Sequence, residues 1–85
     1  MQKKVVLYAL STCGWCKRTK ALLNDNGIVY EVHDVDTLVG DERKRIMADA
    51  TRWNPRGSFP TIVIDDGKTV IVGFDEARIR EALDL

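Results

Sequence analysis

The order of the first three segments most constrains the fold of this chain. Val5–Leu10 is a short, continuously apolar run rich in β-branched residues, which is typical of a strand buried on both faces. Gly14–Asn26 then places its apolar residues on one helical face and ends at the strong stop signal Asn26-Gly27. Ile28–Val35 is interpreted as a second strand. Two strands joined through a helix in about 33 residues form a βαβ unit, so the strands are predicted to be parallel with a right-handed crossover.

The middle of the chain predicts a second helix and a β-hairpin. Asp41–Trp53 carries apolar residues at helical spacing after an acidic start, and Asn54–Ser58 follows as a loop. Thr61–Ile64 and Thr69–Val72 are two β-branched runs separated by Asp66-Gly67. These two strands are expected to pair antiparallel across a tight turn.

The C-terminal segment predicts a third helix. Asp75 is a suitable N-cap, Phe74 precedes it in a position to pack on Ile79, and Leu83 continues the same face. The predicted order is therefore βαβαββα. This is an α/β fold with one mixed sheet, whose first strand lies inside the sheet because it leads into the crossover. A chain of 85 residues has room for a single domain, spanning residues 1–85.

Composition and charge exclude several classes of function. The 13 basic and 13 acidic side chains balance, which argues against general nucleic-acid binding. No stretch approaches the roughly 20 apolar residues that cross a bilayer, and the apolar run after Lys3-Lys4 is too short for a secretory signal. We therefore expect a cytoplasmic protein that binds no membrane. Structural disulfides are rare in the cytoplasm, so two close cysteines there indicate redox or metal chemistry.

The two cysteines lie three residues apart, in Cys13-Gly14-Trp15-Cys16, at the predicted start of the first helix. Residues at this spacing share one helix face, with about 5–6 Å between Cβ atoms. A disulfide can form and break across that separation with little backbone motion. The loop that this disulfide would close is too small to stabilise the fold much, so the cysteine pair indicates a role in redox or metal chemistry. Ser11 and Thr12 supply hydroxyl groups at the helix start.

The helix start predicts different roles for the two sulfurs. Cys13 lies beside free backbone N–H groups and the positive end of the helix dipole, which favour a thiolate, whereas Cys16 is one turn further in and more shielded. Cys13 is therefore expected to attack a substrate disulfide, and Cys16 to resolve the resulting mixed disulfide. Lys17, Arg18 and Lys20 either lower the Cys13 pKa and attract an acidic partner or form only a solvated helix face.

A metal site is disfavoured by the residues available. A structural zinc ion needs four ligands, commonly two cysteine pairs, and this chain offers one pair and His33. His33 beside Asp34 is interpreted as a surface residue at a strand end, and Trp53 as a core residue. Asp65-Asp66 is interpreted as the acidic flank of a turn, not as a catalytic carboxylate pair.

Three segments together resemble the glutaredoxin family, and the likeness covers essentially the whole chain. They are Tyr8–Cys16, Phe59-Pro60-Thr61 ahead of a strand, and Val72–Glu76 at the last helix. The resemblance implies a thioredoxin-like fold with a four-stranded mixed sheet flanked by three helices. It also implies the activity of a glutaredoxin-like disulfide reductase.

The resemblance further implies roles for single residues. Cys13 is similar to the family's nucleophile and Cys16 to its resolving cysteine, while Pro60 matches a cis-proline packed against the cysteines. Phe59 would offer its backbone groups to a substrate cysteine. Gly73–Asp75 matches the segment that receives the γ-glutamyl end of glutathione, although Asp75 also fits a plain helix cap. The substrate-binding residues expected in this way are Thr12, Gly14, Trp15, Phe59, Pro60, Gly73, Phe74 and Asp75.

Three positions depart from the pattern common in the family. Gly14-Trp15 stands where many members have Pro-Tyr, and Trp15 is either a substrate-contacting aromatic at the rim or a ring packed over the site. Leu10 occupies the position where a lysine often holds the glycine carboxylate of glutathione, and Arg56 lies near the family's second polar anchor. The reductant is therefore either glutathione or a thioredoxin-reductase-like protein.

The favoured prediction is an enzyme that reduces protein disulfides or glutathione mixed disulfides by a dithiol mechanism. Such an enzyme is expected to need no resident cofactor, with glutathione as a candidate co-substrate. Its expected partners are disulfide-containing proteins, and it is expected to be a monomer. The alternative is a [2Fe–2S] carrier or sensor, in which Cys13 of two chains and two external thiols bind the cluster. Gly14 in place of proline leaves room for such a cluster.

Overall fold

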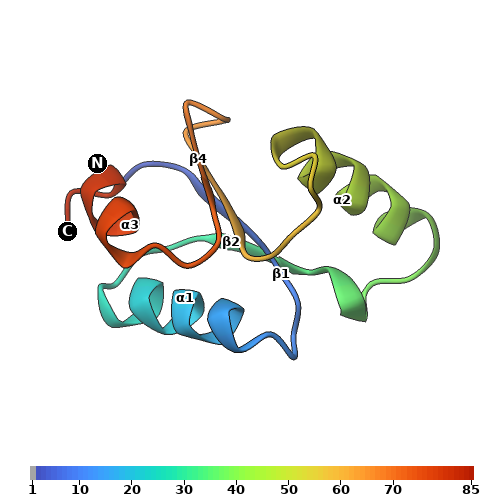
Figure 1. Ribbon diagram of the computed structural model, residues 1–85, viewed down its shortest axis with the longest axis horizontal. Coiled ribbons are helices and arrows are strands. Elements are labelled where there is room, and N and C mark those ends of the chain that lie inside the picture. Colours follow the sequence, from blue (N-terminus) through green and yellow to red (C-terminus); the bar gives the residue numbers. More distant parts are fainter. Residues whose placement is uncertain (1) are drawn as a thin grey trace.

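The computed structural model describes residues 2–85, and its elements follow the predicted βαβαββα order (Figure 1). In chain order they are β1 (Val5–Ala9), α1 (Gly14–Asp25), β2 (Glu31–Asp34), the 3₁₀ helix η1 (Val35–Thr37), α2 (Gly40–Trp53), β3 (Thr61–Ile64), β4 (Thr69–Val72) and α3 (Glu76–Ala82). The predicted hairpin strands agree with β3 and β4 at every boundary, and α2 begins one residue earlier than expected.

The four strands form one mixed sheet in the order β2-β1-β3-β4. β1 pairs in parallel with β2 and antiparallel with β3, and β3 pairs antiparallel with β4. The prediction that the first strand lies inside the sheet and is parallel to the second is confirmed. Both neighbours of β1 satisfy its backbone, which suits its continuously apolar sequence.

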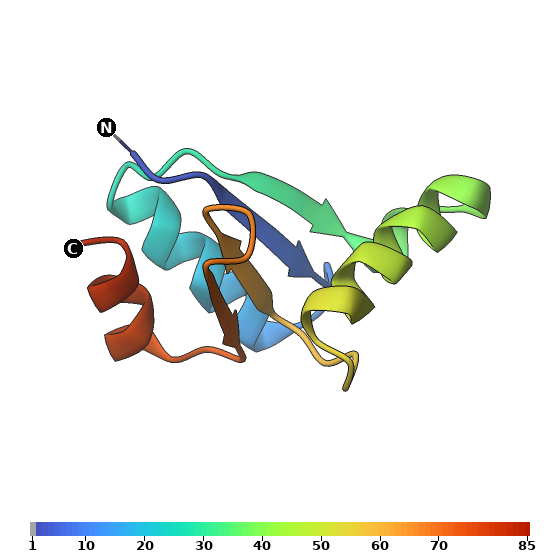
Figure 2. The same ribbon diagram turned by 90° about the horizontal axis from the view of Figure 1, so that it is seen from above.

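Helices cover both faces of the sheet (Figures 1 and 2). The face that carries Leu7 packs with α1 and α3, and the face that carries Tyr8 packs with α2. Alternate residues of β1 therefore enter two separate cores, because successive strand side chains point to opposite faces. Figure 2 shows that α2 extends beyond the sheet, and only Ile46 and Ala50 of this helix are buried.

The second strand is shorter than predicted: Ile28–Val35 was expected, and β2 spans Glu31–Asp34. Ile28 lies in the turn that closes the end of α1, because its N–H donates to the Leu23 carbonyl at 2.9 Å. The backbone of Val29 is bound by a side chain instead of a strand, since its N–H donates to Gln2 Oε1 at 2.7 Å. Apolar residues alone predicted strand here, but their backbone groups already have other partners.

The turn between β3 and β4 is wider than a two-residue turn at Asp66-Gly67. It spans residues 65–68, with Asp65, Asp66 and Gly67 all at positive φ (52°, 55° and 99°). The Lys68 N–H closes it on the Asp65 carbonyl at 3.3 Å. The two aspartates therefore belong to a turn, in agreement with the sequence interpretation.

One end of the sheet gathers segments that are far apart in the chain. β1 and its parallel neighbour β2 both finish there, and the antiparallel register places the start of β3 and the end of β4 beside them, through the pairs Tyr8↔Thr61 and Thr61↔Val72. The segments that follow β1, β2 and β4 and precede β3 therefore meet at this end. Among residues 2–85, no helix is long and apolar enough to cross a bilayer.

Candidate active site

Cys13 is the N-cap of α1 and carries a free thiol. Its Sγ accepts a hydrogen bond from the Cys16 backbone N–H at 3.3 Å. A hydrogen bond from the Cys16 side chain, together with backbone N–H groups of Cys16 and Trp15 and the charge of Lys20, lowers the pKa of the Cys13 thiol. Ser11 and Thr12 were expected to supply the helix-start hydroxyls, but the sulfur of Cys13 takes the capping position.

Cys16 lies one turn further along α1 and is fully buried, with 0% of its surface exposed. Its Sγ accepts a hydrogen bond from the Leu10 backbone N–H at 3.5 Å. Burial raises the pKa of the Cys16 thiol to about 11, above its ordinary value of 9.0. The two sulfurs therefore differ in exposure and in acidity, and a thiolate forms far more readily on Cys13.

Phe59 and Pro60 form the segment directly before β3. The bond between them is cis, in agreement with the resemblance, and Pro60 is buried. The Gly73 N–H donates to the Pro60 carbonyl at 2.8 Å, which ties this segment to the end of β4. Phe59, Phe74 and Cys13 pack against the same hydrophobic core. The structure thus brings the Phe59-Pro60 and Gly73-Phe74 segments to the helix start that carries Cys13.

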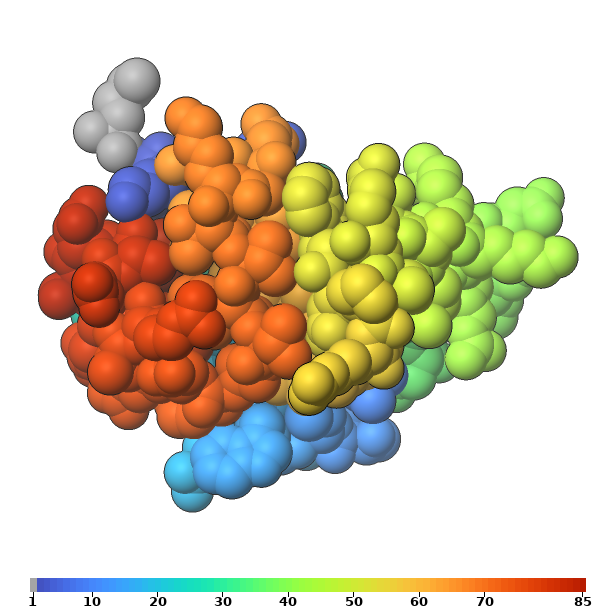
Figure 3. All heavy atoms as spheres, turned by 45° about the horizontal axis from the view of Figure 1, so that its top comes forward, coloured from blue at the N-terminus to red at the C-terminus, as the bar shows by residue number. Residues whose placement is uncertain are grey.

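An aromatic shelf of Trp15 and Phe74 forms part of the surface beside Cys13. The two rings stack with centroids 5.8 Å apart and an interplanar angle of 20°, and the Arg18 guanidinium lies 5.0 Å from the centroid of the Trp15 ring. Trp15 remains 56% exposed. Figure 3 shows the light-blue start of α1 at the surface, next to the orange segment that joins β4 to α3. Trp15 therefore lies at the rim and is open to a partner.

The other residues predicted to bind substrate surround this shelf in different ways. Thr12 and Gly14 are exposed, and a Cβ added at Gly14 would meet no atom within 4 Å. Asp75 is the N-cap of α3 and accepts from the Arg78 N–H at 3.1 Å. The helix-cap function of Asp75 is thus present in the structure. Arg56 is exposed in the loop before β3 and lines a surface hollow with Trp53.

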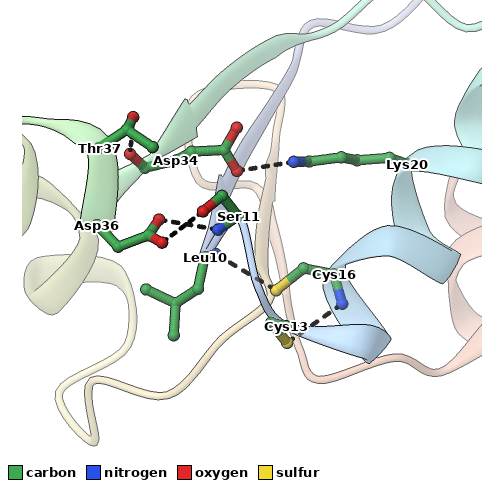
Figure 4. A network of polar contacts seen from close by, with 8 residues as sticks. All are labelled: Leu10, Ser11, Cys13, Cys16, Lys20, Asp34, Asp36 and Thr37. Carbon is green, nitrogen blue, oxygen red and sulfur yellow. Dashed lines mark hydrogen bonds and ion pairs between the residues drawn. The ribbon is translucent and has the colours of Figure 1, made fainter.

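Polar contacts behind the cysteines are the part of the site that the sequence interpretation missed (Figure 4). The Ser11 N–H and hydroxyl both donate to the Asp36 carboxylate, at 2.8 and 2.5 Å, and Lys20 forms an ion pair with Asp34 at 2.7 Å. One signal could have located them. Asp34 ends β2, the strand parallel to β1, and Asp36 follows it in η1, and the ends of parallel neighbours meet at one edge of the sheet.

The single histidine lies on the sheet face that α2 covers. His33 Nε2 pairs with Glu31 Oε2 at 2.8 Å, and its ring stacks on Tyr8 with centroids 5.6 Å apart. Within residues 2–85, no three His, Cys, Asp or Glu side chains gather as a metal site would require. His33 is therefore more enclosed than a plain surface residue, and both of these contacts are with residues of the sheet.

Comparison with known proteins places the chain in a family. The Glutaredoxin family model matches residues 5–70. A probable glutaredoxin of Synechocystis is 40% identical over 63 residues, which cover 74% of this chain and 67% of that protein. An uncharacterised glutaredoxin-like protein of Clostridium pasteurianum is 31% identical over 80 residues, covering 94% of this chain and 97% of that one.

Solved structures agree with this assignment. The crystal structure of methanoredoxin from Methanosarcina acetivorans superposes with a TM-score of 0.93 and 46% identity, over 99% of this chain and 87% of that one. A glutaredoxin from Methanosarcina mazei has a TM-score of 0.86 and 48% identity, over 96% of this chain and 79% of that one. The fold is thus the thioredoxin-like fold of these proteins. The chain belongs to the glutaredoxin family of thiol–disulfide oxidoreductases.

Proposed function

We propose that this protein reduces disulfides in other proteins by a dithiol mechanism, with Cys13 as the nucleophile and Cys16 as the resolving cysteine. The observation that carries the proposal is the difference between the two sulfurs. Cys13 caps the helix and has a lowered pKa, whereas Cys16 is buried and has a pKa raised to about 11. A thiolate is the nucleophile in disulfide exchange, so attack begins at Cys13.

The reaction proceeds in two exchanges. The Cys13 thiolate attacks one sulfur of the substrate disulfide, forms a mixed disulfide and releases the other substrate sulfur as a thiolate. Cys16 then loses its proton to solvent and attacks the Cys13 sulfur, which releases the second substrate thiolate and leaves a Cys13–Cys16 disulfide. Two electrons pass from the protein to the substrate. The Leu10 N–H, 3.5 Å from Cys16 Sγ, stabilises the thiolate that the second exchange requires.

The substrate is proposed to lie against the segments that meet at Cys13. The backbone of Phe59 would pair with the chain on either side of the substrate cysteine, and the Trp15–Phe74 shelf would contact its apolar side chains. Thr12, Gly14 and Gly73 border this surface without large side chains.

A reductant must return two electrons to the Cys13–Cys16 disulfide after each cycle. We propose glutathione or a thioredoxin-reductase-like protein as the donor. The Gly73–Asp75 segment supports glutathione, because it begins a helix whose N–H groups suit a carboxylate. Leu10 supports a protein donor, because it supplies no cation for a second carboxylate.

Separate replacement of each cysteine tests the mechanism. Cys13→Ser is expected to abolish reduction of both a protein disulfide and a glutathione mixed disulfide. Cys16→Ser is expected to abolish reduction of the protein disulfide only, because exchange with glutathione needs a single thiol. Turnover would be measured with insulin and with a glutathionylated peptide as substrates. Full activity of Cys13→Ser would exclude the proposed function, and full insulin reduction by Cys16→Ser would exclude the dithiol mechanism.

A further inference from the structure

The segment between β1 and α1 contacts both cysteines through one residue, Leu10. Its N–H donates to Cys16 Sγ at 3.5 Å, and its carbonyl accepts from the Cys13 N–H at 3.2 Å. The position of the Leu10 backbone therefore determines whether the Cys16 sulfur receives a hydrogen bond from the Leu10 N–H. Ala9, which precedes Leu10, is fixed by strand pairing in β1. The Leu10 backbone is therefore held on both sides if Ser11, which follows it, is also fixed.

Asp36 holds that other side. Its carboxylate accepts from the Ser11 N–H at 2.8 Å and from the Ser11 hydroxyl at 2.5 Å (Figure 4). The Leu10 carbonyl and the Ser11 N–H belong to one trans peptide and point in opposite directions. This peptide therefore binds Asp36 on one side and the Cys13 N–H on the other, and hydrogen bonds linked in this way strengthen one another.

Asp36 is itself held in place. It lies in η1, whose first residue, Val35, is 1% exposed and packs in the core under α2. The Thr37 hydroxyl donates to the Asp34 carbonyl at 2.8 Å and closes the turn. The two hydrogen bonds from Ser11 lower the pKa of the Asp36 carboxyl, which keeps it ionised and able to accept both at neutral pH.

We propose that Asp36 is a positioning residue for the second exchange of the reaction. Through Ser11 it fixes the Leu10 backbone so that the Leu10 N–H points at the Cys16 sulfur. Within residues 2–85, the Asp36 carboxylate accepts hydrogen bonds from Ser11, and no hydrogen bond joins it to either cysteine. Its loss should therefore slow the release of the mixed disulfide by Cys16 and leave the first attack by Cys13 nearly unchanged. The inference rests on the proposed dithiol function.

Rapid mixing with an aromatic disulfide, dithiobis(nitrobenzoate), separates the two exchanges. Each exchange releases one coloured thiolate: the first when Cys13 attacks the reagent, the second when Cys16 displaces it from Cys13. Asp36→Ala is expected to slow the second release about fivefold, the effect of losing one net hydrogen bond, with the first release within twofold of the parent protein. Ser11→Ala, which keeps the N–H bond, should slow the second release about twofold.

Asp36→Asn and Glu81→Ala are the matched controls. Asparagine keeps an oxygen for the Ser11 N–H and loses the charge, so it should restore most of the second rate. Glu81 is exposed on α3, and its removal subtracts the same charge without touching the Leu10–Cys13 segment. If Asp36→Asn and Asp36→Ala both accelerate the second release, the carboxylate acts as a repulsive charge and the proposal is wrong.

The outcomes also distinguish the inference from the function on which it rests. If the parent protein releases no second thiolate, the dithiol function fails. If it releases both and Asp36→Ala matches it in both phases, only the positioning role of Asp36 fails. Circular dichroism would verify that each variant is folded. If Asp36→Ala does not fold, the rate of the second release in Ser11→Ala tests the proposal instead.

Discussion

At the scale of single residues, the thiols of Cys13 and Cys16 differ in acidity because Cys13 is the helix N-cap and Cys16, one turn further along, is buried in the core. The Cys13 sulfur replaces the hydroxyl or carboxylate that usually accepts the first N–H groups of a helix. Cys16 enters the core between the sheet and α1, where burial penalises its thiolate. The same short motif thus contains one thiol that ionises readily and one that stays protonated more easily.

Removing the Cys16 thiol should therefore change the titration of Cys13. The first cause of the lowered Cys13 pKa is the hydrogen bond from the Cys16 side chain, so Cys16→Ala should raise that pKa towards 9.0. The thiolate is present above the pKa, and its loss on acidification would then begin at higher pH. The rate of alkylation by iodoacetamide as a function of pH measures the midpoint. An unchanged midpoint would assign the shift to the backbone N–H groups of Cys16 and Trp15 instead.

At the scale of elements, the β3–β4 turn packs on the end of α2. The ring of Trp53 lies so close to Gly67 that an added Cβ would overlap with its ring atoms Cζ3 and Cη2, and Gly67 has φ +99°. Trp53 borders the core under α2, so it cannot move aside without losing packing. Trp53, interpreted as a core residue, is half-buried: its ring packs on the core under α2, and the β3–β4 turn lies against it at Gly67.

Gly67→Ala is accordingly expected to destabilise the protein by about 3 kcal/mol, the combined effect of steric conflict and positive φ. Gly57→Ala is the control, because Gly57 also has positive φ (+68°) but no atom within 4 Å of an added Cβ. It should cost about 1 kcal/mol. Urea unfolding measures both free energies. Equal losses in the two variants would show that the Trp53 contact adds nothing to the requirement for glycine at position 67.

At the scale of the whole molecule, one end of the sheet collects the chemistry. Cys13 follows β1, Asp36 follows β2, Pro60 precedes β3 and Gly73 follows β4. The strand order β2-β1-β3-β4 and the mixed directions place all four segments at this end. Under the proposed function, the electron donor and the disulfide acceptor would both bind at this one surface, so the same residues would determine the choice of each.

The identity of residue 10 is expected to affect the choice of donor. Leu10→Lys should lower the KM for glutathione about fivefold, because an added ammonium group beside the site attracts a glutathione carboxylate by roughly 1 kcal/mol. Leu10→Met keeps the apolar contact that Leu10 makes with the core under α2 and should leave the KM unchanged. Turnover coupled to glutathione reductase measures this constant, and the same assay with thioredoxin reductase provides the comparison. Equal KM values for the lysine and methionine variants would show that residue 10 does not select the donor.

The sequence by itself determined most of the fold and the position of the two cysteines at the start of a helix. The apolar run of β1, the stop signal after α1 and the hairpin strands are local signals, and each was interpreted correctly because neighbours in sequence produce them. The closeness of the Cys13 and Cys16 side chains in space likewise follows from helix geometry, because residues three apart lie on one helix face. The cis bond before Pro60 was expected only from the family resemblance, because no local property of the chain demands it.

Only the tertiary structure decided the contacts between segments distant in the chain. Asp36 meets Ser11 across 25 positions, and Trp15 stacks on Phe74 although the two residues are 59 positions apart in the chain. The first part of the predicted second strand was lost in the same way, since the Gln2 side chain binds Val29 across 27 positions. Local preference states what a segment can form, and the partners that the fold brings to its backbone and side chains decide what it does form.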